Sequence, residues 1–270
     1  MAVSDKFGYV PDMSREKNQS IEDNSSSGTT SFGFRNVTRG EKTRLVRDVF
    51  DTVANRYDVM NDLMSGGVHR LWKAELIRRL RPDGDMALID VGGGTGDIAF
   101  RFLKKGGENV VVCDINTEML SVGRDRALDH AILGGAVWVC GDAEALPLPD
   151  GCADAYVSAF CLRNVTTLTN ALSEARRVLK PGGHFLCLEF SSVAAPVLSK
   201  LYDAYSFNVL PIIGQAVTGN KDAYRYLAES IRRFPGQRDF AEMIKDAGLD
   251  NVRYDNLSGG IAAIHSAWRI

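Results

Sequence analysis

Short apolar runs alternate with stretches of helical period through the middle of the chain. The runs of strand length are Ala87–Val91, Val110–Asp114, Val137–Gly141, Ala153–Ala159 and Phe185–Phe190. Most of them are separated by the helix-period stretches Asp97–Lys105, Met119–Leu128 and Leu168–Leu179. Almost wholly apolar strands that are joined through helices are typical of a parallel sheet with helices on both faces. The pattern therefore predicts an α/β protein with a mostly parallel sheet.

Helical periodicity also precedes this region, and a different pattern follows it. One helix is expected from about Glu41 and a second over His69–Leu80, because apolar side chains recur there at three- and four-residue intervals. A helix over Asp239–Ala247 is followed by Asn251–Asn256 and Ile261–Arg269, two strand-like runs joined by Ser-Gly-Gly. We expect this hairpin to add an antiparallel strand at one edge of the sheet.

Two segments do not fit the alternation of strands and helices. Residues 1–34 include a polar, serine-rich stretch, 19–31. This stretch can bury too few apolar side chains to offset the conformational entropy lost on folding, so we expect a disordered tail there. Residues 194–235 are too long for a plain loop and carry many aromatic and aliphatic side chains. We expect one domain over 35–270, with N-terminal helices over 41–80 and residues 194–235 inserted as a helical lid or substrate segment.

Composition is that of a soluble globular protein. Hydrophobic residues make up 45% and charged residues 24% of the chain, and no apolar run approaches the ~18–20 residues that span a bilayer. With 32 Lys and Arg against 34 Asp and Glu, the net charge of −2 gives no general attraction for nucleic acid. The five cysteines form no CxxC pair and have no histidine at ligand spacing, so we expect buried thiols and no metal site.

A glycine-rich turn follows the first expected strand of the sheet, where the chain reads DVGGGTGD from Asp90. Such a turn at a helix N-terminus lets a ligand lie against bare backbone. A dinucleotide fingerprint that starts at Gly92 would need its third glycine at position 97, which is aspartate. Acids at this turn would repel a diphosphate, whereas they suit the sulfonium and ammonium groups of S-adenosylmethionine. The series Asp90, Gly92, Gly94 and Gly96 has the spacing seen in class I S-adenosylmethionine methyltransferases.

Acidic residues also end the next two expected strands. Asp114 closes the second strand, where a carboxylate can accept hydrogen bonds from both hydroxyls of a ribose. Asp142 and Ala143 follow the third strand and could place a carboxylate and a backbone N–H against adenine. A tight turn or a helix cap would explain each motif alone. Three of them in order at the carboxyl ends of neighbouring strands favour a nucleoside cofactor.

Two blocks of the chain match known signatures, namely residues 57–72 (YDVMNDLMSGGVHRLW) and 177–191 (RVLKPGGHFLCLEFS). In both blocks the chain resembles the ubiquinone/menaquinone biosynthesis C-methyltransferase (UbiE) family. The similarity runs from about Phe32 to the C-terminus, and it includes three shorter stretches, 162–165, 202–210 and 226–232. The block at 57–72 is the most specific of these, because the glycine turns recur in many methyltransferases.

The resemblance implies a Rossmann-like class I methyltransferase fold and methyl transfer from S-adenosylmethionine to a ring carbon of a polyprenylated quinol. Such a quinol is 2-methoxy-6-polyprenyl-1,4-benzoquinol or demethylmenaquinol. The resemblance also implies cofactor contacts at Thr95, Asp114, Asp142 and Ala143. A further cofactor contact of the family is often a serine where this chain has Ala159, so that contact stays unassigned.

A ring carbon attacks a sulfonium methyl group only after a hydroxyl para or ortho to it has lost its proton. The site must therefore stabilise a phenolate and accept protons. Arg163 follows the fourth expected strand, and we expect it to hold the phenolate or orient a water, with Asn164 positioning it. The alternative is an arginine that pairs with an acid to hold its loop. His69 is a candidate proton acceptor or else a structural histidine, and Tyr57 is a candidate lid or pocket wall.

Partners and location follow from the resemblance as well. We expect a polyprenyl quinol as substrate, no nucleic acid, and a cytoplasmic protein in peripheral contact with the inner membrane. A homodimer and a quinone-biosynthesis complex both stay open, and residues 194–235 either bind the polyprenyl tail or simply pack over the sheet edge. The competing hypotheses are a nicotinamide-dependent dehydrogenase, another small-molecule O- or N-methyltransferase, and a S-adenosylmethionine-binding scaffold subunit without turnover.

Overall fold

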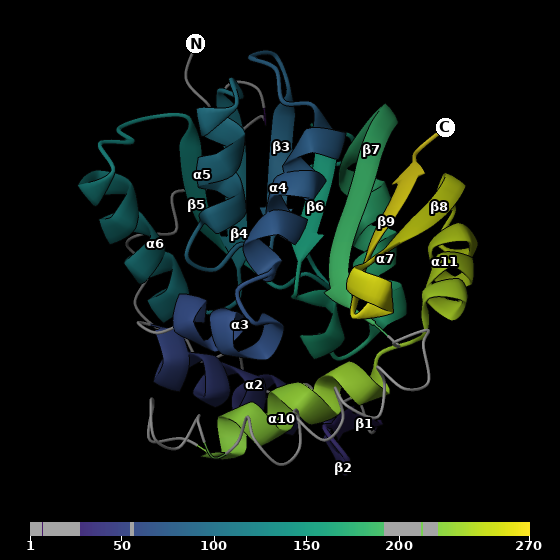
Figure 1. Cartoon of the computed structure of the whole chain (residues 1–270). Helices are drawn as coiled ribbons and strands as arrows, with labels where there is room; N and C mark the ends of the chain where they lie inside the picture. The colour runs from purple at the N-terminus through teal and green to yellow at the C-terminus, as the bar shows by residue number, and fades with distance from the viewer. Residues whose placement is uncertain (1–6, 8–27, 55–56, 192–211, 213–220) are drawn as a thin grey trace.

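A seven-stranded sheet forms the centre of the computed structural model, which describes residues 7, 28–54, 57–191, 212 and 221–270 (Figure 1). Its strand order is β5-β4-β3-β6-β7-β9-β8. The strands are β3 (Ala87–Val91), β4 (Asn109–Asp114), β5 (Ala136–Cys140), β6 (Ala153–Ala159), β7 (Leu179–Phe190), β8 (Asp250–Leu257) and β9 (Ala262–Trp268). β3 to β7 pair in parallel, and β9 runs antiparallel to both β7 and β8. The mostly parallel sheet is confirmed, and its antiparallel strand lies one position inside the edge formed by β8.

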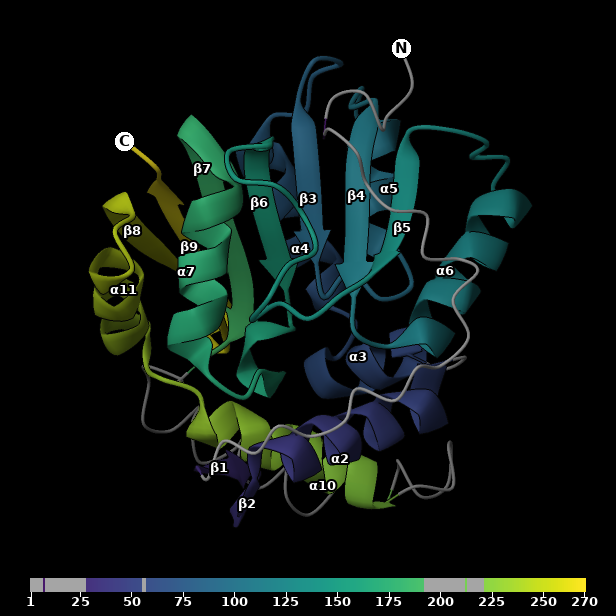
Figure 2. The same cartoon turned by 180° about the vertical axis from the view of Figure 1, so that it is seen from behind.

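Helices cover both faces of this sheet (Figures 1 and 2). One face carries α4 (His69–Leu80), α5 (Asp97–Lys104) and α6 (Thr117–Asp129), and the other carries α7 (Leu168–Val178) and α11 (Gln237–Asp246). Neighbouring residues of β3 point to opposite faces, so Leu88 belongs to the first hydrophobic cluster and Ile89 to the second. Both side chains are fully buried, which is why apolar residues follow one another at this point of the strand, with neither face exposed.

A cap lies over the end of the sheet at which β3 to β6 finish (Figures 1 and 2). It consists of α2 (Arg39–Val53), α3 (Tyr57–Ser65), α10 (Lys221–Arg233) and a hairpin of β1 (Thr29–Phe32) and β2 (Arg35–Thr38). α2 begins at Thr38, whose side chain accepts a hydrogen bond from the Glu41 N–H at 3.3 Å. Because ligands of open α/β sheets bind at this end of the strands, the cap lies where a site is expected.

The predicted tail boundary at residue 34 is wrong, since Thr29–Phe32 already form a strand. The hydroxyl of Thr30 donates to the carbonyl of Thr166 at 3.2 Å, so this hairpin is part of the domain. So short a strand depends on contacts with distant parts of the chain, which local periodicity does not reveal. Of residues 1–27, the structure describes Phe7, which is buried in the second cluster, and the disorder expected for the others lies outside the described residues.

The segment 194–235 is described only at residue 212 and from residue 221 onward. Its described C-terminal part forms α10, which agrees with the helical segment expected here. The Lys-Pro-Gly-Gly stretch follows α7 and lies within β7, where the pairing with β6 shifts between Ala153 and Ala155. A proline is tolerated at such an irregularity because no ladder hydrogen bond is needed there.

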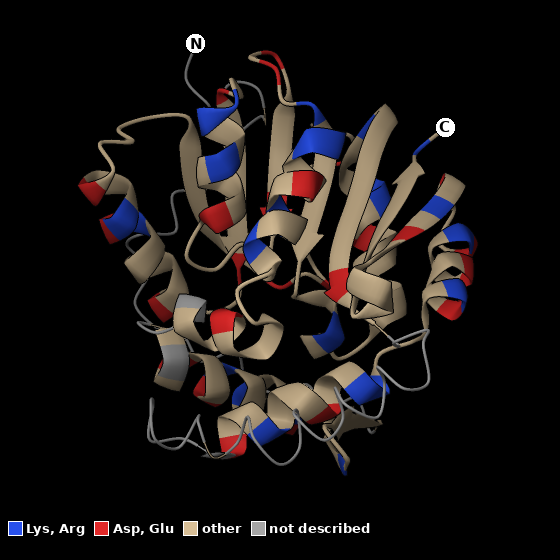
Figure 3. Cartoon of the chain, viewed as in Figure 1, with Lys and Arg blue, Asp and Glu red and all other residues tan. Residues whose placement is uncertain are grey.

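Charges of both signs are interspersed over the helices of the view in Figure 3. Such a mixture gives no broad field of one sign for a polyanion to follow. Across the residues that the structure describes, no helix is both long and apolar enough to cross a membrane.

Candidate active site

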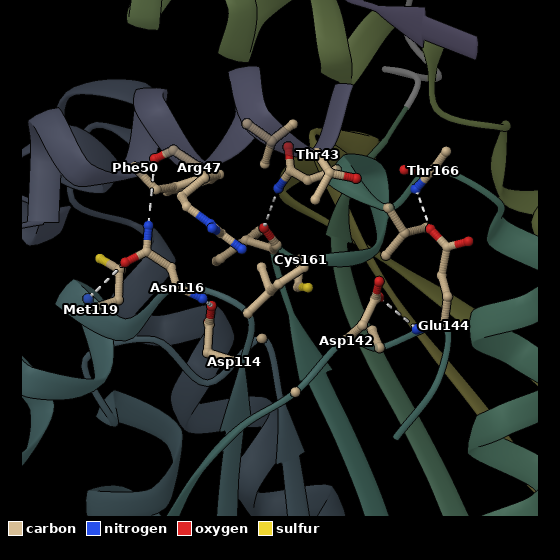
Figure 4. A pocket seen from close by; sticks show the side chains of 18 residues that line it. Thr43, Arg47, Phe50, Asp114, Asn116, Met119, Asp142, Glu144, Cys161 and Thr166 are labelled. Carbon is tan, nitrogen blue, oxygen red and sulfur yellow. Dashed lines mark hydrogen bonds between the residues drawn. The ribbon is translucent and has the colours of Figure 1, made fainter. Parts of the chain in front are cut away.

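A cavity of about 760 Å³, counted with its open mouth, lies between α2 and the strand ends (Figure 4). Its floor and walls come from the loops after β3, β4, β5 and β6, as the sequence predicted for converging turns. Five of the predicted site residues line it: Gly92, Asp114, Asp142, Ala143 and Asn164.

Asp114, at the end of β4, is held toward the cavity by two backbone donors. Its Oδ2 accepts a hydrogen bond from the Gly94 N–H at 2.9 Å, and its Oδ1 accepts one from the Asn116 N–H at 2.9 Å. Burial raises the pKa of Asp114 to about 6, and these N–H groups oppose the rise. The carboxylate keeps lone pairs for further donors, which is what two ribose hydroxyls require.

The glycine turn approaches the opposite loop so closely that a side chain at Gly92 would not fit. A Cβ there would lie 2.1 Å from Sγ of Cys161, and the φ of +66° is in the left-handed region. Gly94 also has a positive φ, and it acts on the cavity through its bond to Asp114. The lack of a side chain at Gly92 thus lets the glycine turn pack against the loop after β6, and Gly92 also lines the cavity.

Asp142 belongs to a tight turn after β5 and lines the cavity at the same time. Its Oδ1 accepts a hydrogen bond from the Glu144 N–H at 2.9 Å. Glu144 in turn accepts a hydrogen bond from the N–H of Thr167 at 2.9 Å, which ties this turn to the loop after β6. The tight turn offered as an alternative reason for an aspartate at position 142 is therefore present. The same turn places Asp142 and Ala143 at the wall of the cavity.

A smaller cavity of about 290 Å³ adjoins the glycine turn, and Asp90, Thr95 and Lys73 line it. Asp90 is 1% exposed, and neither carboxylate oxygen has a hydrogen-bond partner among the described residues; the Ala99 N–H lies near it without completing a bond. Lys73 pairs with Asp97 instead, at 2.8 Å. Burial raises the pKa of Asp90 to about 7. A buried carboxylate without a donor fits a cationic ligand group such as an ammonium.

Thr95 lies in this smaller cavity rather than in the larger one. Its hydroxyl accepts a hydrogen bond from Nη1 of Arg126 at 2.9 Å, and the side chain is buried. The hydroxyl hydrogen can still be donated to a ligand, because a hydroxyl both donates and accepts. The predicted cofactor contact at Thr95 therefore stays a prediction.

Arg163 stands on the short 3₁₀ helix η3 (Leu162–Asn164) with a fully buried side chain. Its Nη1 donates to the carbonyl of Phe160 at 2.6 Å and to Oε2 of Glu189 at 3.0 Å. Burial raises the pKa of the Glu189 carboxyl, an effect that Arg163 opposes. Glu189 is thus the acid that an arginine needs if it only holds its loop. Arg163 does not line the larger cavity. A role of Arg163 in the reaction stays a prediction.

Asn164, the next residue, does line the cavity. Its Oδ1 accepts a hydrogen bond from the hydroxyl of Tyr226 in α10 at 3.0 Å. The resemblance in residues 226–232 marked this stretch in the sequence without giving it a role. A contact between residues so far apart in the chain is invisible to periodicity, which reports only neighbours on one element.

His69, the predicted proton acceptor, lies outside both cavities and is 1% exposed. The ring Nε2 of His69 is 2.8 Å from Oδ1 of Asp62, and the backbone N–H of His69 donates to the hydroxyl of Ser65 at 3.1 Å. Burial lowers the pKa of His69. This geometry fits the structural alternative, because a buried and paired imidazole has no described route to a ligand, while a role as proton acceptor stays a prediction. The side chain of Tyr57 lies outside the described residues.

The sequence predicted α2 but not that it forms the roof of the cavity. Figure 4 shows Thr43, Arg47 and Phe50 reaching from α2 toward the strand ends. Hydrogen bonds hold this roof at two places. Near the start of α2, Nζ of Lys42 donates to the carbonyl of Val165 at 2.6 Å. Further along the helix, the side-chain amide of Asn116 donates to Asp51 and to the backbone carbonyl of Arg47. An amphipathic stripe indicates that a helix is buried on one side, but it does not indicate what that side faces.

Two solved methyltransferase structures have the same fold as this chain. One from Thermotoga maritima superposes with a TM-score of 0.60 at 18% identity and covers 83% of this chain and 100% of its own. Phosphoethanolamine N-methyltransferase 2 from Haemonchus contortus, in complex with S-adenosyl-L-methionine, gives 0.58 at 17% identity over 83% of this chain and 60% of its own. These likenesses confirm the class I methyltransferase fold.

Sequence comparisons identify the family. The ubiquinone/menaquinone biosynthesis C-methyltransferase UbiE of Rhodopseudomonas palustris strain BisB5 is 56% identical over 90% of this chain and 98% of its own length. The mitochondrial 2-methoxy-6-polyprenyl-1,4-benzoquinol methylase of Mus musculus is 47% identical over 93% of this chain and 88% of its own. The model of the ubiE/COQ5 methyltransferase family matches residues 38–269. The chain therefore belongs to the ubiE/COQ5 methyltransferase family.

Proposed function

We propose that this protein methylates a ring carbon of a polyprenylated quinol with S-adenosylmethionine, in the biosynthesis of ubiquinone, menaquinone or both. One observation carries the proposal: a single cavity joins the acid-and-glycine turns after β3, β4 and β5 to Asn164 after β6. The names of the relatives from Rhodopseudomonas palustris and Mus musculus support the quinol ring as the methyl acceptor.

The described residues fit the ribose, the adenine and the ammonium group of the cofactor. Asp114 would accept both ribose hydroxyls, while Asp142 and the Ala143 N–H would contact the adenine. Gly92 offers bare backbone, and Asp90 would face the ammonium group from the smaller cavity. When bound, S-adenosylmethionine supplies the electrophilic methyl group. A dinucleotide fits less well, because Asp90 lies unpaired where a diphosphate would bring negative charge.

The reacting ring is proposed to lie on the side of the cavity formed by the loop after β6. The amide of Asn164 can donate to the oxygen of a phenolate, which raises electron density on the ring carbon. Arg163 and Glu189 hold this loop from behind, and the positive charge of Arg163 is proposed to favour the phenolate. The roof formed by Val46 and Phe50 excludes water and fixes the ring against the methyl donor.

The tail of the substrate and the membrane belong to the proposal as well. We propose that residues 194–235 contribute to binding the polyprenyl tail, and that the cytoplasmic enzyme contacts the inner membrane from which its substrate comes. Leu210 and Ile213, the apolar residues most suited to such a groove, lie outside the described residues. A homodimer or a larger quinone-biosynthesis complex is compatible with the same proposal.

Incubation of the purified protein with methyl-tritiated S-adenosylmethionine and a short-tailed quinol tests the function. We expect label to enter the reduced benzoquinol or naphthoquinol, and none to enter the oxidised quinone, since a quinone has no hydroxyl to ionise. Loss of the ring proton in the product, read by NMR, would establish C-methylation. An O-methylated product would favour another small-molecule methyltransferase, and transfer to neither quinol would favour a scaffold subunit.

A further inference from the structure

Asn164 lies between two groups that both bind its amide. Its Oδ1 accepts a hydrogen bond from the Tyr226 hydroxyl at 3.0 Å, and its Nδ2 donates to the carbonyl of Phe160 at 3.4 Å. A carbonyl oxygen can only accept, so the NH₂ group must face Phe160. The Tyr226 hydroxyl can donate or accept, but its proton finds an acceptor in the amide oxygen, so this bond reinforces the orientation that Phe160 sets.

Tyr226 is itself held firmly by the cap. Its side chain is 4% exposed, and the ring of Phe32 in β1 stacks on it with a centroid distance of 4.1 Å and an interplanar angle of 12°. One turn along α10, Glu229 accepts a hydrogen bond from the Phe34 N–H at 3.0 Å. Burial raises the pKa of Tyr226, so the hydroxyl keeps its proton and remains a donor at neutral pH.

The orientation of this amide decides what the cavity offers to a ligand. An NH₂ group has two hydrogens, and with one directed at Phe160 the other is available on the side of the cavity that Asn164 lines. A phenolate oxygen is stabilised by such a donor. If the amide were turned by 180°, its carbonyl oxygen would lie there instead and would repel the phenolate.

We propose that Tyr226 is a positioning residue, which orients the amide of Asn164 so that an N–H rather than a carbonyl oxygen faces the oxyanion of the substrate. The inference rests on the proposed function and deepens it. It gives the hairpin and α10 a part in the reaction, because Phe32 and Phe34 fix the helix that carries the hydroxyl.

The variant Tyr226→Phe tests the proposal, because it keeps the ring and its stacking on Phe32 and removes only the hydroxyl. We expect kcat with the reduced quinol to fall at least about tenfold, while the Kd for S-adenosylmethionine stays within about twofold. The acidic limb of the pH profile of kcat should move to higher pH, since the bound phenolate is then less stabilised. Ser230→Ala, which removes another buried hydroxyl of α10, is the matched control and should keep kcat.

A double-mutant cycle separates positioning from a general structural effect. In an Asn164→Ala background, Tyr226→Phe should cause no further loss of kcat, because the amide on which it acts is gone. Losses that multiply in the double variant would overturn the proposal, as would an unchanged kcat in Tyr226→Phe.

The side-chain amide of Asn164 provides a readout that needs no turnover. In ¹⁵N NMR its NH₂ signals, assigned by their loss in Asn164→Ala, should be sharp in the wild type and broadened in Tyr226→Phe, where the amide can turn. Identical signals in both proteins would contradict the inference. A wild type that methylates no quinol would instead contradict the proposed function and leave this measurement standing.

Discussion

Asp90 shows how a single buried carboxylate can couple cofactor binding to pH. Its pKa of about 7 in the free protein means that it is partly protonated at neutral pH. A ligand ammonium favours the ionised form, so binding must release this proton below pH 7. Affinity should therefore rise with pH up to about 7 and then level off.

Titration calorimetry of S-adenosylmethionine binding at several pH values checks this expectation. Between pH 6 and 8 we expect the wild-type affinity to rise by up to about tenfold, and the rise to be shallower in Asp90→Asn. Asp114, with its pKa of about 6, accounts for the part that remains. Asp255→Asn, at a mostly exposed carboxylate of β8, should keep the wild-type profile. An unchanged slope in Asp90→Asn would show that Asp90 does not meet the ammonium.

The ion pair of Arg163 and Glu189 leaves one question for mutagenesis, namely whether Arg163 only holds its loop. Arg163→Met leaves a buried, unpaired carboxylate at Glu189, so the free energy of unfolding should fall by ~3–5 kcal/mol. The double variant Arg163→Met/Glu189→Gln removes both charges and should recover most of that loss. Denaturant unfolding measures both effects.

The kcat of the same double variant decides between the two interpretations. We expect kcat to stay at least about tenfold low although stability returns, with an unchanged Kd for S-adenosylmethionine, because the positive charge near the phenolate is missing. Recovery of both stability and kcat would show that Arg163 acts only by holding the loop after β6.

At the scale of elements, α2 is the part whose role the sequence revealed least. Its apolar stripe predicted a helix, but the contacts that make it a roof come from Val165 and Asn116, far along the chain. No local pattern contains such information, because it depends on how the loops after β4 and β6 are placed by the sheet. A bond from a buried lysine to a backbone carbonyl leaves no trace in the spacing of residues.

Lys42→Met tests whether this roof retains the cofactor. The change keeps the buried aliphatic stem and removes the bond from Nζ to Val165, so the roof should open more often. We expect the dissociation rate of S-adenosylmethionine, measured by stopped flow, to rise about fivefold to tenfold. Lys104→Met, at an exposed position of α5, is the control. Equal rates in the wild type and Lys42→Met would mean that α2 stays closed without this bond.

At the scale of the whole molecule, the sheet and its cofactor turns could be predicted because each is encoded locally. β3 and β6 have the bounds that their apolar runs indicate, and Gly92 and Asp114 lie at strand ends that topology brings together. What the sequence did not reveal is long-range: the buried partner of Arg163, the contact of Tyr226 with Asn164, and the hairpin within the predicted tail. These features depend on packing between segments rather than on the period of any one of them.

The hairpin of β1 and β2 packs on α10, although about two hundred residues separate them along the chain. Contacts of such high sequence separation form late, since the intervening loop must close first. During synthesis the cap over the strand ends therefore waits for α10 to leave the ribosome, while β3 to β6 can already pair. A nascent chain that stalls before residue 221 would hold only the five parallel strands β3 to β7 of the sheet, without β8, β9 or the part of the cap that α10 supplies.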